Sequence, residues 1–115
     1  MSRQGLQPLN TEALYNRLMQ DEDLTKIVLA EFCKDLPLQI EALHRAFNDK
    51  DVEAIKRQAH KLKGAAGNVG AEILHQLMLE TEDAARQDDY SALEALLNEI
   101  DSQLAIIKSA SVNPG

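Results

Sequence analysis

Apolar residues recur at every third or fourth position through almost the whole chain, and this spacing constrains the fold more than any other feature of the sequence. Such spacing places apolar side chains on one face of an α-helix, whereas a β-strand requires strict alternation of apolar and polar residues. No segment alternates for long enough to indicate a strand. Among the 115 residues there are five Gly and three Pro, and aromatic residues make up 3%, which is typical of helical proteins. The sequence therefore predicts an all-α fold.

Five segments have this helical spacing. A short one begins after Asn10, a good N-cap residue, and ends near Met19; four longer ones cover residues 23–47, 52 to about 67–70, 73–85 and 93–107. Pro37 removes a hydrogen-bond donor from the second segment, so a kink near Asp35 or two helices on one axis are expected there. Four long amphipathic helices with short connections predict an up-and-down antiparallel four-helix bundle, with the first helix as an accessory element.

One domain accounts for the chain, because 115 residues are too few for two hydrophobic cores. We expect an N-terminal tail over residues 1–9, the helical bundle over residues 10–108 and a disordered tail over residues 109–115. The polar turn over residues 48–51 is expected to supply the N-cap of the third helix. Ser91 with Glu94 predicts a capping box at the start of the last helix.

The charge balance and the hydropathy pattern exclude several classes of partner. The net charge is −7, so the surface repels phosphate backbones and nucleic acid is not expected as a partner. No stretch approaches about 18 consecutive apolar residues, and the N-terminus lacks the apolar core of a secretory signal. No membrane contact and a cytoplasmic location are therefore expected. Cys33 is expected to be a buried free thiol, and the cysteine and histidines lack the close pairing of a metal site.

The third helical segment carries the residues that suggest chemistry. On a helical wheel of about 100° per residue, Lys56, Lys63, Gly64 and Gly67 all lie within about 60° of His60, and the apolar stripe lies on the far side. His60 is therefore expected to point outwards. Each glycine inside a helix costs about 1 kcal/mol relative to Ala, so we expect the two glycines to form a notch where a second macromolecule approaches the ring.

Lysines beside an imidazole stabilise a negatively charged group that is attached to the ring. Lys56 and Lys63 are neighbours of His60 on the helix surface, four residues before it and three after it. A phosphoryl group fits this environment, because an imidazole nitrogen attacks phosphorus and lysine meets the charge of the product. A surface histidine in a solvated basic patch is the alternative that the wheel leaves open. His44 and His75 are expected to be bystanders.

The stretch AHKLKGAAGNVGA, residues 59–71, resembles the signature of the histidine-containing phosphotransfer (HPt) domains of multistep two-component phosphorelays, which is roughly AHxLKGxxxxxGA. The matching positions are Ala59, His60, Leu62, Lys63, Gly64, Gly70 and Ala71. The resemblance extends from Leu9 to about Ile107. Met78 and Thr81 depart from residues that are common in the family, and both are expected to be core substitutions.

The resemblance implies that His60 accepts a phosphoryl group from an aspartyl phosphate on one receiver domain and passes it to the aspartate of another. It also implies that Lys63 stabilises the phosphohistidine and that the receiver supplies the acidic residues and Mg²⁺, so that this chain needs no metal or cofactor of its own. The residues expected to meet the receiver are Gly64, Lys56, Gly67, Glu82 and Arg86, the last two because family members place polar side chains there that reach towards the histidine.

The expected partners are then the receiver domains of a hybrid histidine kinase and of a response regulator. We expect the chain to act as a monomeric phosphoryl carrier without an ATP site, since no glycine-rich nucleotide loop occurs in the sequence. A free-standing protein and the C-terminal domain of a hybrid sensor kinase both fit. Two rivals remain open: an interaction bundle that docks a partner without chemistry, and an autophosphorylating domain like the dimerising domain of a histidine kinase.

Overall fold

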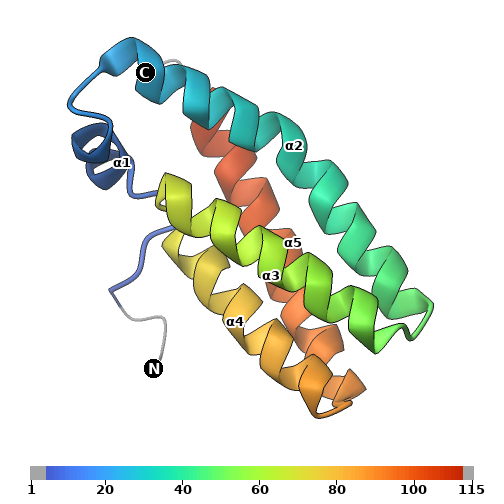
Figure 1. The fold of residues 1–115 in the computed structure, drawn as a ribbon. Helices are drawn as coiled ribbons and strands as arrows, with labels where there is room; N and C mark the ends of the chain where they lie inside the picture. Colours follow the sequence, from blue (N-terminus) through green and yellow to red (C-terminus); the bar gives the residue numbers. More distant parts are fainter. Residues whose placement is uncertain (1–4, 113–115) are drawn as a thin grey trace.

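The computed structural model describes residues 5–112, and all regular structure within this range is helical (Figure 1). The helices are α1 (Thr11–Arg17), α2 (Glu22–Asn48), α3 (Val52–Val69), α4 (Glu72–Arg86) and α5 (Tyr90–Val112). Helices α2 to α5 run up and down as a bundle, in which α3 packs between α2 and α4 while α5 closes the circuit against both. The short α1 lies at one end of this bundle, as Figure 1 shows. The prediction of an all-α bundle with an accessory first helix is confirmed.

Side-chain caps explain where most of the helices begin. The side chains of Asn10, Asp21 and Asp51 accept hydrogen bonds from backbone N–H groups in the first turns of α1, α2 and α3. The predicted capping box of α5 is wrong. Asp89 accepts a hydrogen bond of 3.0 Å from the amide of Ala92, so the helix begins at Tyr90, two residues earlier than a cap at Ser91 predicts, and Ser91 lies inside it.

Two further boundaries differ from the prediction. Helix α2 is continuous from Glu22 to Asn48 with Pro37 inside it, which excludes the alternative of two coaxial helices. Helix α5 continues to Val112, past the point at which a disordered tail was expected to begin. Residues 113–115 of that expected tail lie outside the described residues.

The apolar stripes meet in one core. Its largest fully buried side chains include Leu36 and Leu43 on α2, Ile55 and Leu62 on α3, Leu74, Leu77 and Met78 on α4, and Leu93, Ile100 and Ile107 on α5. Each such side chain stabilises the fold by about 1.5–3 kcal/mol relative to an exposed one. Because Ala59 and Leu62 on α3 are both buried, the rotation of that helix about its axis is fixed, and His60 between them faces solvent.

The segment before α1 is fastened to the turn between α3 and α4. The amide of Asn10 donates to the carbonyl of Gly70 at 2.7 Å, and the carbonyl of Gln7 accepts from the amides of Glu72 and Ile73. Gly70 ends α3 with a left-handed φ of 80°, and a Cβ there would lie 2.7 Å from the carbonyl oxygen of Asn10. Both the backbone angle and the close approach therefore require glycine at this position. None of the described helices is long and apolar enough to span a membrane.

Candidate functional site

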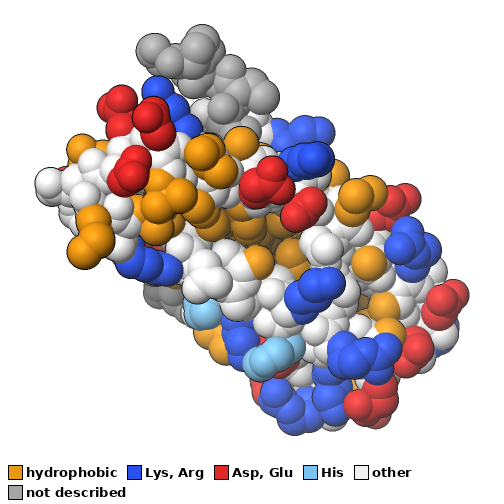
Figure 2. All heavy atoms as spheres, turned by 45° about the horizontal axis from the view of Figure 1, so that its top comes forward, with side chains coloured by type: hydrophobic (Ala, Val, Ile, Leu, Met, Phe, Trp, Pro, Cys, Tyr) orange, Lys and Arg blue, Asp and Glu red, His pale blue; other side chains and the backbone are white. Residues whose placement is uncertain are grey.

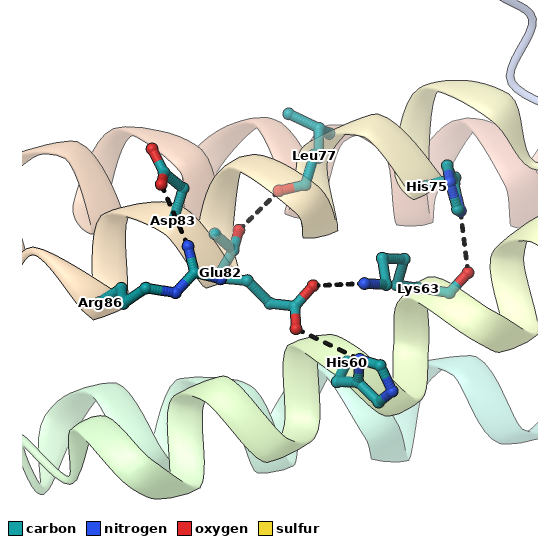
Figure 3. A network of polar contacts seen from close by, with 8 residues as sticks. His60, Lys63, His75, Leu77, Glu82, Asp83 and Arg86 are labelled. Atoms are coloured by element: carbon teal, nitrogen blue, oxygen red, sulfur yellow. Dashed lines mark hydrogen bonds and ion pairs between the residues drawn. The ribbon is translucent and has the colours of Figure 1, made fainter.

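His60 lies near the middle of α3 on the edge that faces α4, with 71% of its side chain exposed. Because α3 and α4 pack closely along their length, this edge brings side chains of α4 within reach of the imidazole. Figure 3 shows Glu82 extending from α4 towards both His60 and Lys63. The outward orientation predicted for His60 is what the structure has.

Glu82 links the two residues through its two carboxylate oxygens. Oε2 lies 3.2 Å from Nδ1 of His60, and Oε1 lies 2.7 Å from Nζ of Lys63. The Glu82 side chain is 14% exposed and that of Lys63 is 22% exposed, so the ion pair is largely shielded from water while the ring of His60 is not. The sequence prediction that Glu82 reaches the histidine agrees with this geometry.

The electrostatic environment keeps Glu82 ionised. Burial alone raises the pKa of Glu82, but the hydrogen bond and positive charge of Lys63, together with the contact to His60, outweigh burial and hold the pKa below its ordinary value. An ionised carboxylate can only accept hydrogen bonds, so Nδ1 of His60 must be the donor. In the neutral ring this leaves the lone pair on Nε2, which has no hydrogen-bond partner among residues 5–112. The arrangement presents an exposed nitrogen nucleophile with an ammonium group close by.

The second lysine predicted beside the ring behaves differently. Nζ of Lys56 lies 3.2 Å from Oε2 of Glu53, one turn earlier on the same helix. Among the described residues, Lys56 therefore pairs with a carboxylate of its own helix and not with a group beside His60. Arg86 likewise pairs within its own helix, with Asp83 at 3.2 Å, as Figure 3 shows. The structure brings neither Lys56 nor Arg86 into contact with the histidine.

The two glycines of the predicted notch have different surroundings. A Cβ at Gly64 would meet nothing within 4 Å, so the surface beside His60 is open there. A Cβ at Gly67 would lie 3.2 Å from Nδ1 of His75 on α4. The absence of a side chain at Gly67 is thus explained by the packing of α4 against α3, and of the two glycines Gly64 is the one that leaves free space.

His75, which the sequence predicts to be a bystander, is part of the structure that supports the site. Its Nδ1 donates to the carbonyl oxygen of Lys63 at 3.0 Å, and its ring lies over Gly67. This contact ties α4 to the turn of α3 that carries Lys63. The signal in the sequence was the pairing of a histidine on one helix with a glycine on its neighbour, which becomes visible only once the register of the helices is known. His44, the other predicted bystander, bonds Asp101 on α5 at 2.8 Å.

The remaining polar and thiol groups near the core have structural roles. Thr81 is buried, and its hydroxyl donates to the carbonyl of Leu77 at 2.7 Å, which satisfies the polar atom that replaces an apolar residue there. Cys33 is a free thiol and is half-buried, packed against the core. Within the described part of the chain no three His, Cys, Asp or Glu side chains converge as metal ligands.

Comparison with known proteins places this geometry in a family. The family model of the Hpt domain matches residues 27–109. Histidine-containing phosphotransfer protein B from Pseudomonas aeruginosa PAO1 is 27% identical over 90% of both chains, with a TM-score of 0.82. The HPT domain of a sensor hybrid histidine kinase from Shewanella has the same fold, with 24% identity over 90% of both chains and a TM-score of 0.78. A search of curated proteins gave no significant match. Because the family model covers most of the bundle, including His60 and Glu82, the chain belongs to the Hpt domain family.

Proposed function

We propose that His60 carries a phosphoryl group from the aspartate of one receiver domain to the aspartate of another. In the first step Nε2 attacks phosphorus, a P–N bond forms, and the bond to the aspartyl oxygen breaks with its electron pair returning to the donor carboxylate. In the second step an aspartate oxygen of the acceptor attacks phosphorus and the P–N bond breaks. Nδ1 keeps its proton throughout, so neither step requires a base on this chain. Hpt domains are phosphotransfer carriers of phosphorelays, and the proposal assigns that role to one residue here.

The contact between Glu82 and Nδ1 of His60 is the observation that carries the proposal. It holds the ring in the tautomer whose free lone pair is on the exposed nitrogen, and the carboxylate stabilises the positive charge that the ring gains when Nε2 bonds phosphorus. Glu82 thereby acts as a positioning residue. Lys63 contacts the same carboxylate as the ring, and in the phosphorylated state its ammonium group bonds the phosphoryl oxygens, which lowers the free energy of that state.

The proposal also assigns the partners and their contributions. The donor and acceptor are receiver domains of a hybrid histidine kinase and of a response regulator, and they supply Mg²⁺ and the acidic residues that hold it. This chain acts in the cytoplasm as a monomer, without kinase activity of its own. The open surface at Gly64 supports the part of the proposal that concerns a protein partner, because it leaves room for one to approach the imidazole.

Phosphoryl transfer from a panel of purified, phosphorylated receiver domains tests the proposal. We expect an acid-labile, alkali-stable label on the wild-type chain, no label on His60→Gln, and normal labelling of His44→Gln, which removes another partly exposed imidazole. Label that persists in His60→Gln would show that another residue is modified. Binding of a receiver without transfer, equal in wild type and His60→Gln, would favour an interaction bundle. Incorporation from labelled ATP alone would favour an autophosphorylating domain.

A further inference from the structure

Helix α2 carries a row of exposed apolar side chains outside its core stripe. Ile27 is 60% exposed and Leu38 is 65% exposed. Eleven residues separate these two positions, which is close to three full turns, so they lie in line along the helix. Glu31 and Asp35 lie between them, at helical spacing from Ile27 and Leu38 respectively, and both are exposed. We call these four residues the α2 row.

A groove runs beside the α2 row, between α2 and α3. It encloses about 340 Å³, and Glu31 and Asp35 line it on the α2 side while Lys61 lines it on the α3 side. None of these three charged side chains has a hydrogen bond or ion pair with another described residue. The apolar lining consists of Val28, Phe32 and Leu36 from α2 and Leu62, Ala65 and Val69 from α3. Figure 2 shows this hollow as an apolar strip with acidic side chains along one edge.

The groove begins next to His60 on α3, because Lys61 lines it. Lys61 follows His60 in the chain, and Gly64 and Ala65 lie one turn further along the same side of α3. Lys63 occupies the opposite edge of α3, where it pairs with Glu82 of α4. A protein that places an aspartate over the exposed nitrogen of His60 therefore extends over the open surface at Gly64, then over the groove and onto the α2 row.

We propose that the groove and the α2 row select the receiver, and that Glu31 and Asp35 favour receivers that present a basic side chain beside an apolar one. This inference rests on the function proposed for His60. The reacting pocket of a receiver is acidic and lies over His60, where Arg57 and Lys61 of α3 attract it. The part of the receiver that reaches α2 meets the negative charges of Glu31 and Asp35. An acidic receiver surface is therefore repelled there. The apolar side chain of the receiver fills the groove, and the contact of its basic side chain with Glu31 and Asp35 sets the orientation of the receiver.

Replacing the apolar residues of the α2 row tests the docking surface. The probe is a receiver that phosphorylates the wild-type chain. For Ile27→Glu and Leu38→Glu we expect the receiver concentration at half-maximal transfer to rise about tenfold, as for loss of an interface anchor, with the maximal rate retained. Leu79→Glu and Ile106→Glu are matched controls, because these residues are 40% and 44% exposed on α4 and α5. Transfer to Ile27→Glu and Leu38→Glu with wild-type kinetics, or an equal loss in the controls, would overturn the proposal.

Charge reversal tests the specificity. In Glu31→Lys with Asp35→Lys, we expect the ranking of receivers in the panel to shift, with loss of about fivefold or more for those with a basic docking surface and gain for those with an acidic one. An unchanged ranking would overturn the assignment of these two residues.

Two further measurements separate the possible causes of failure. Phosphoramidate, a small phosphoryl donor, reports the reactivity of His60 without any docked protein, so failure to label the wild-type chain with it would count against the function proposed for His60 and not against the groove alone. Sedimentation velocity identifies a rival occupant: a wild-type chain that dimerises, with the dimer abolished by Ile27→Glu, would mean that a second copy covers the groove, and the proposal would fall.

Discussion

Glu82 contacts two groups of α3 that have different requirements. Nδ1 of His60 needs an acceptor for its proton, and the ammonium of Lys63, which is 22% exposed, needs a counter-charge. One ionised carboxylate meets both needs because one of its oxygens contacts His60 and the other contacts Lys63. An isosteric amide keeps the shape of Glu82 but offers one acceptor oxygen instead of two.

Glu82→Gln is therefore expected to weaken control of the His60 tautomer. The amide oxygen will stay with Lys63, and its NH₂ group will face Nδ1, which favours the tautomer with the proton on Nε2. We expect ¹⁵N NMR of the imidazole to show this shift, and single-turnover transfer from a receiver to slow by about 10–100-fold, as for loss of a group that orients a reacting side chain. Asp83→Asn is the control, because Asp83 bonds Arg86 and Gln87 instead. A variant that keeps both the wild-type tautomer and the wild-type rate would contradict the role of Glu82.

At the residue scale, the sequence predicted the outward direction of His60 and its place beside Lys63 on one face of α3, because helical periodicity alone decides which side chains share a face. It could not decide which oppositely charged groups pair. Lys56 and Lys63 are equivalent neighbours of His60 on a wheel, yet one pairs with Glu53 on α3 and the other with Glu82 on α4. That choice depends on the register between α3 and α4, which the spacing of residues within one helix does not determine. Arg86, which the family resemblance placed near the histidine, pairs with Asp83 within α4.

At the scale of the elements, the register between α3 and α4 means that alanine at the two glycines of α3 changes the free energy of unfolding differently. Alanine at Gly64 places its Cβ in open space and removes the entropic cost of glycine, so Gly64→Ala is expected to raise the free energy of unfolding by about 0.5–1 kcal/mol. Alanine at Gly67 places its Cβ 3.2 Å from Nδ1 of His75, so Gly67→Ala is expected to gain less or to destabilise. Urea denaturation of the two variants measures the difference, and equal gains would mean that His75 does not constrain Gly67.

The same two positions separate docking from folding. Gly64→Leu is expected to leave the bundle folded while it slows transfer from a receiver, because its side chain fills the open surface beside His60. Circular dichroism gives the control for folding. Transfer to Gly64→Leu at the wild-type rate would show that the surface at Gly64 stays clear of the receiver.

The segment before α1 depends on a carboxylate in the first turn of α4. Glu72 accepts from the side chain of Asn10 and from the amide of Gln7, both at 2.9 Å, and these bonds lower the pKa of Glu72 in that order of importance. Because the pKa of Glu72 is lowered in the folded state, its bonds stabilise the docked segment fully at a pH above the ordinary pKa of a glutamate. This stabilisation is lost as the pH falls through the lowered pKa. The segment should therefore loosen in acid before α2 to α5 unfold.

Hydrogen exchange of the Gln7 amide, corrected for the intrinsic effect of pH, measures this loosening. We expect protection of this amide to fall as the pH falls through the lowered pKa of Glu72, and we expect Glu72→Gln to remove most of that pH dependence. Glu12→Gln is the control, since Glu12 lies in the first turn of α1 and accepts none of these bonds. Protection that is independent of pH in the wild type would mean that the backbone bonds of Gln7 and Asn10 hold the segment without Glu72.

At the scale of the whole molecule, the fold was more predictable than the site because it depends on a property that repeats along the chain. The stripes of α2 to α5 each bury enough apolar surface to fix which face turns inwards, so the bundle follows from the four stripes and their short connections. The error at the start of α5 falls where a local polar contact decides the outcome, because Asp89 caps the helix in place of the predicted box at Ser91. A single hydrogen bond of about 1 kcal/mol moves such a boundary without changing the core.

Charge is also distributed unevenly over the molecule. Helix α3 carries four basic residues and one acidic residue, whereas α4 and α5 together carry seven acidic residues and two basic ones. A chain with a net charge of −7 repels an acidic partner at long range, so attraction must come from the α3 face within about 8–10 Å, the distance over which salt of physiological strength leaves charges unscreened. Reversing the charge of Lys61 should therefore affect transfer far more than reversing that of Lys26, although both changes alter the net charge equally.

We expect Lys61→Glu to lower the second-order rate constant for transfer from a receiver by about fivefold or more at low salt, and the deficit to shrink as the salt concentration rises. Lys26→Glu, on α2, should stay within about twofold of the wild type under the same conditions. Stopped-flow measurement of transfer at two ionic strengths distinguishes the two variants. Equal losses in both would mean that association responds to the net charge of the whole chain, and the basic face of α3 would then have no special part in drawing the receiver to His60.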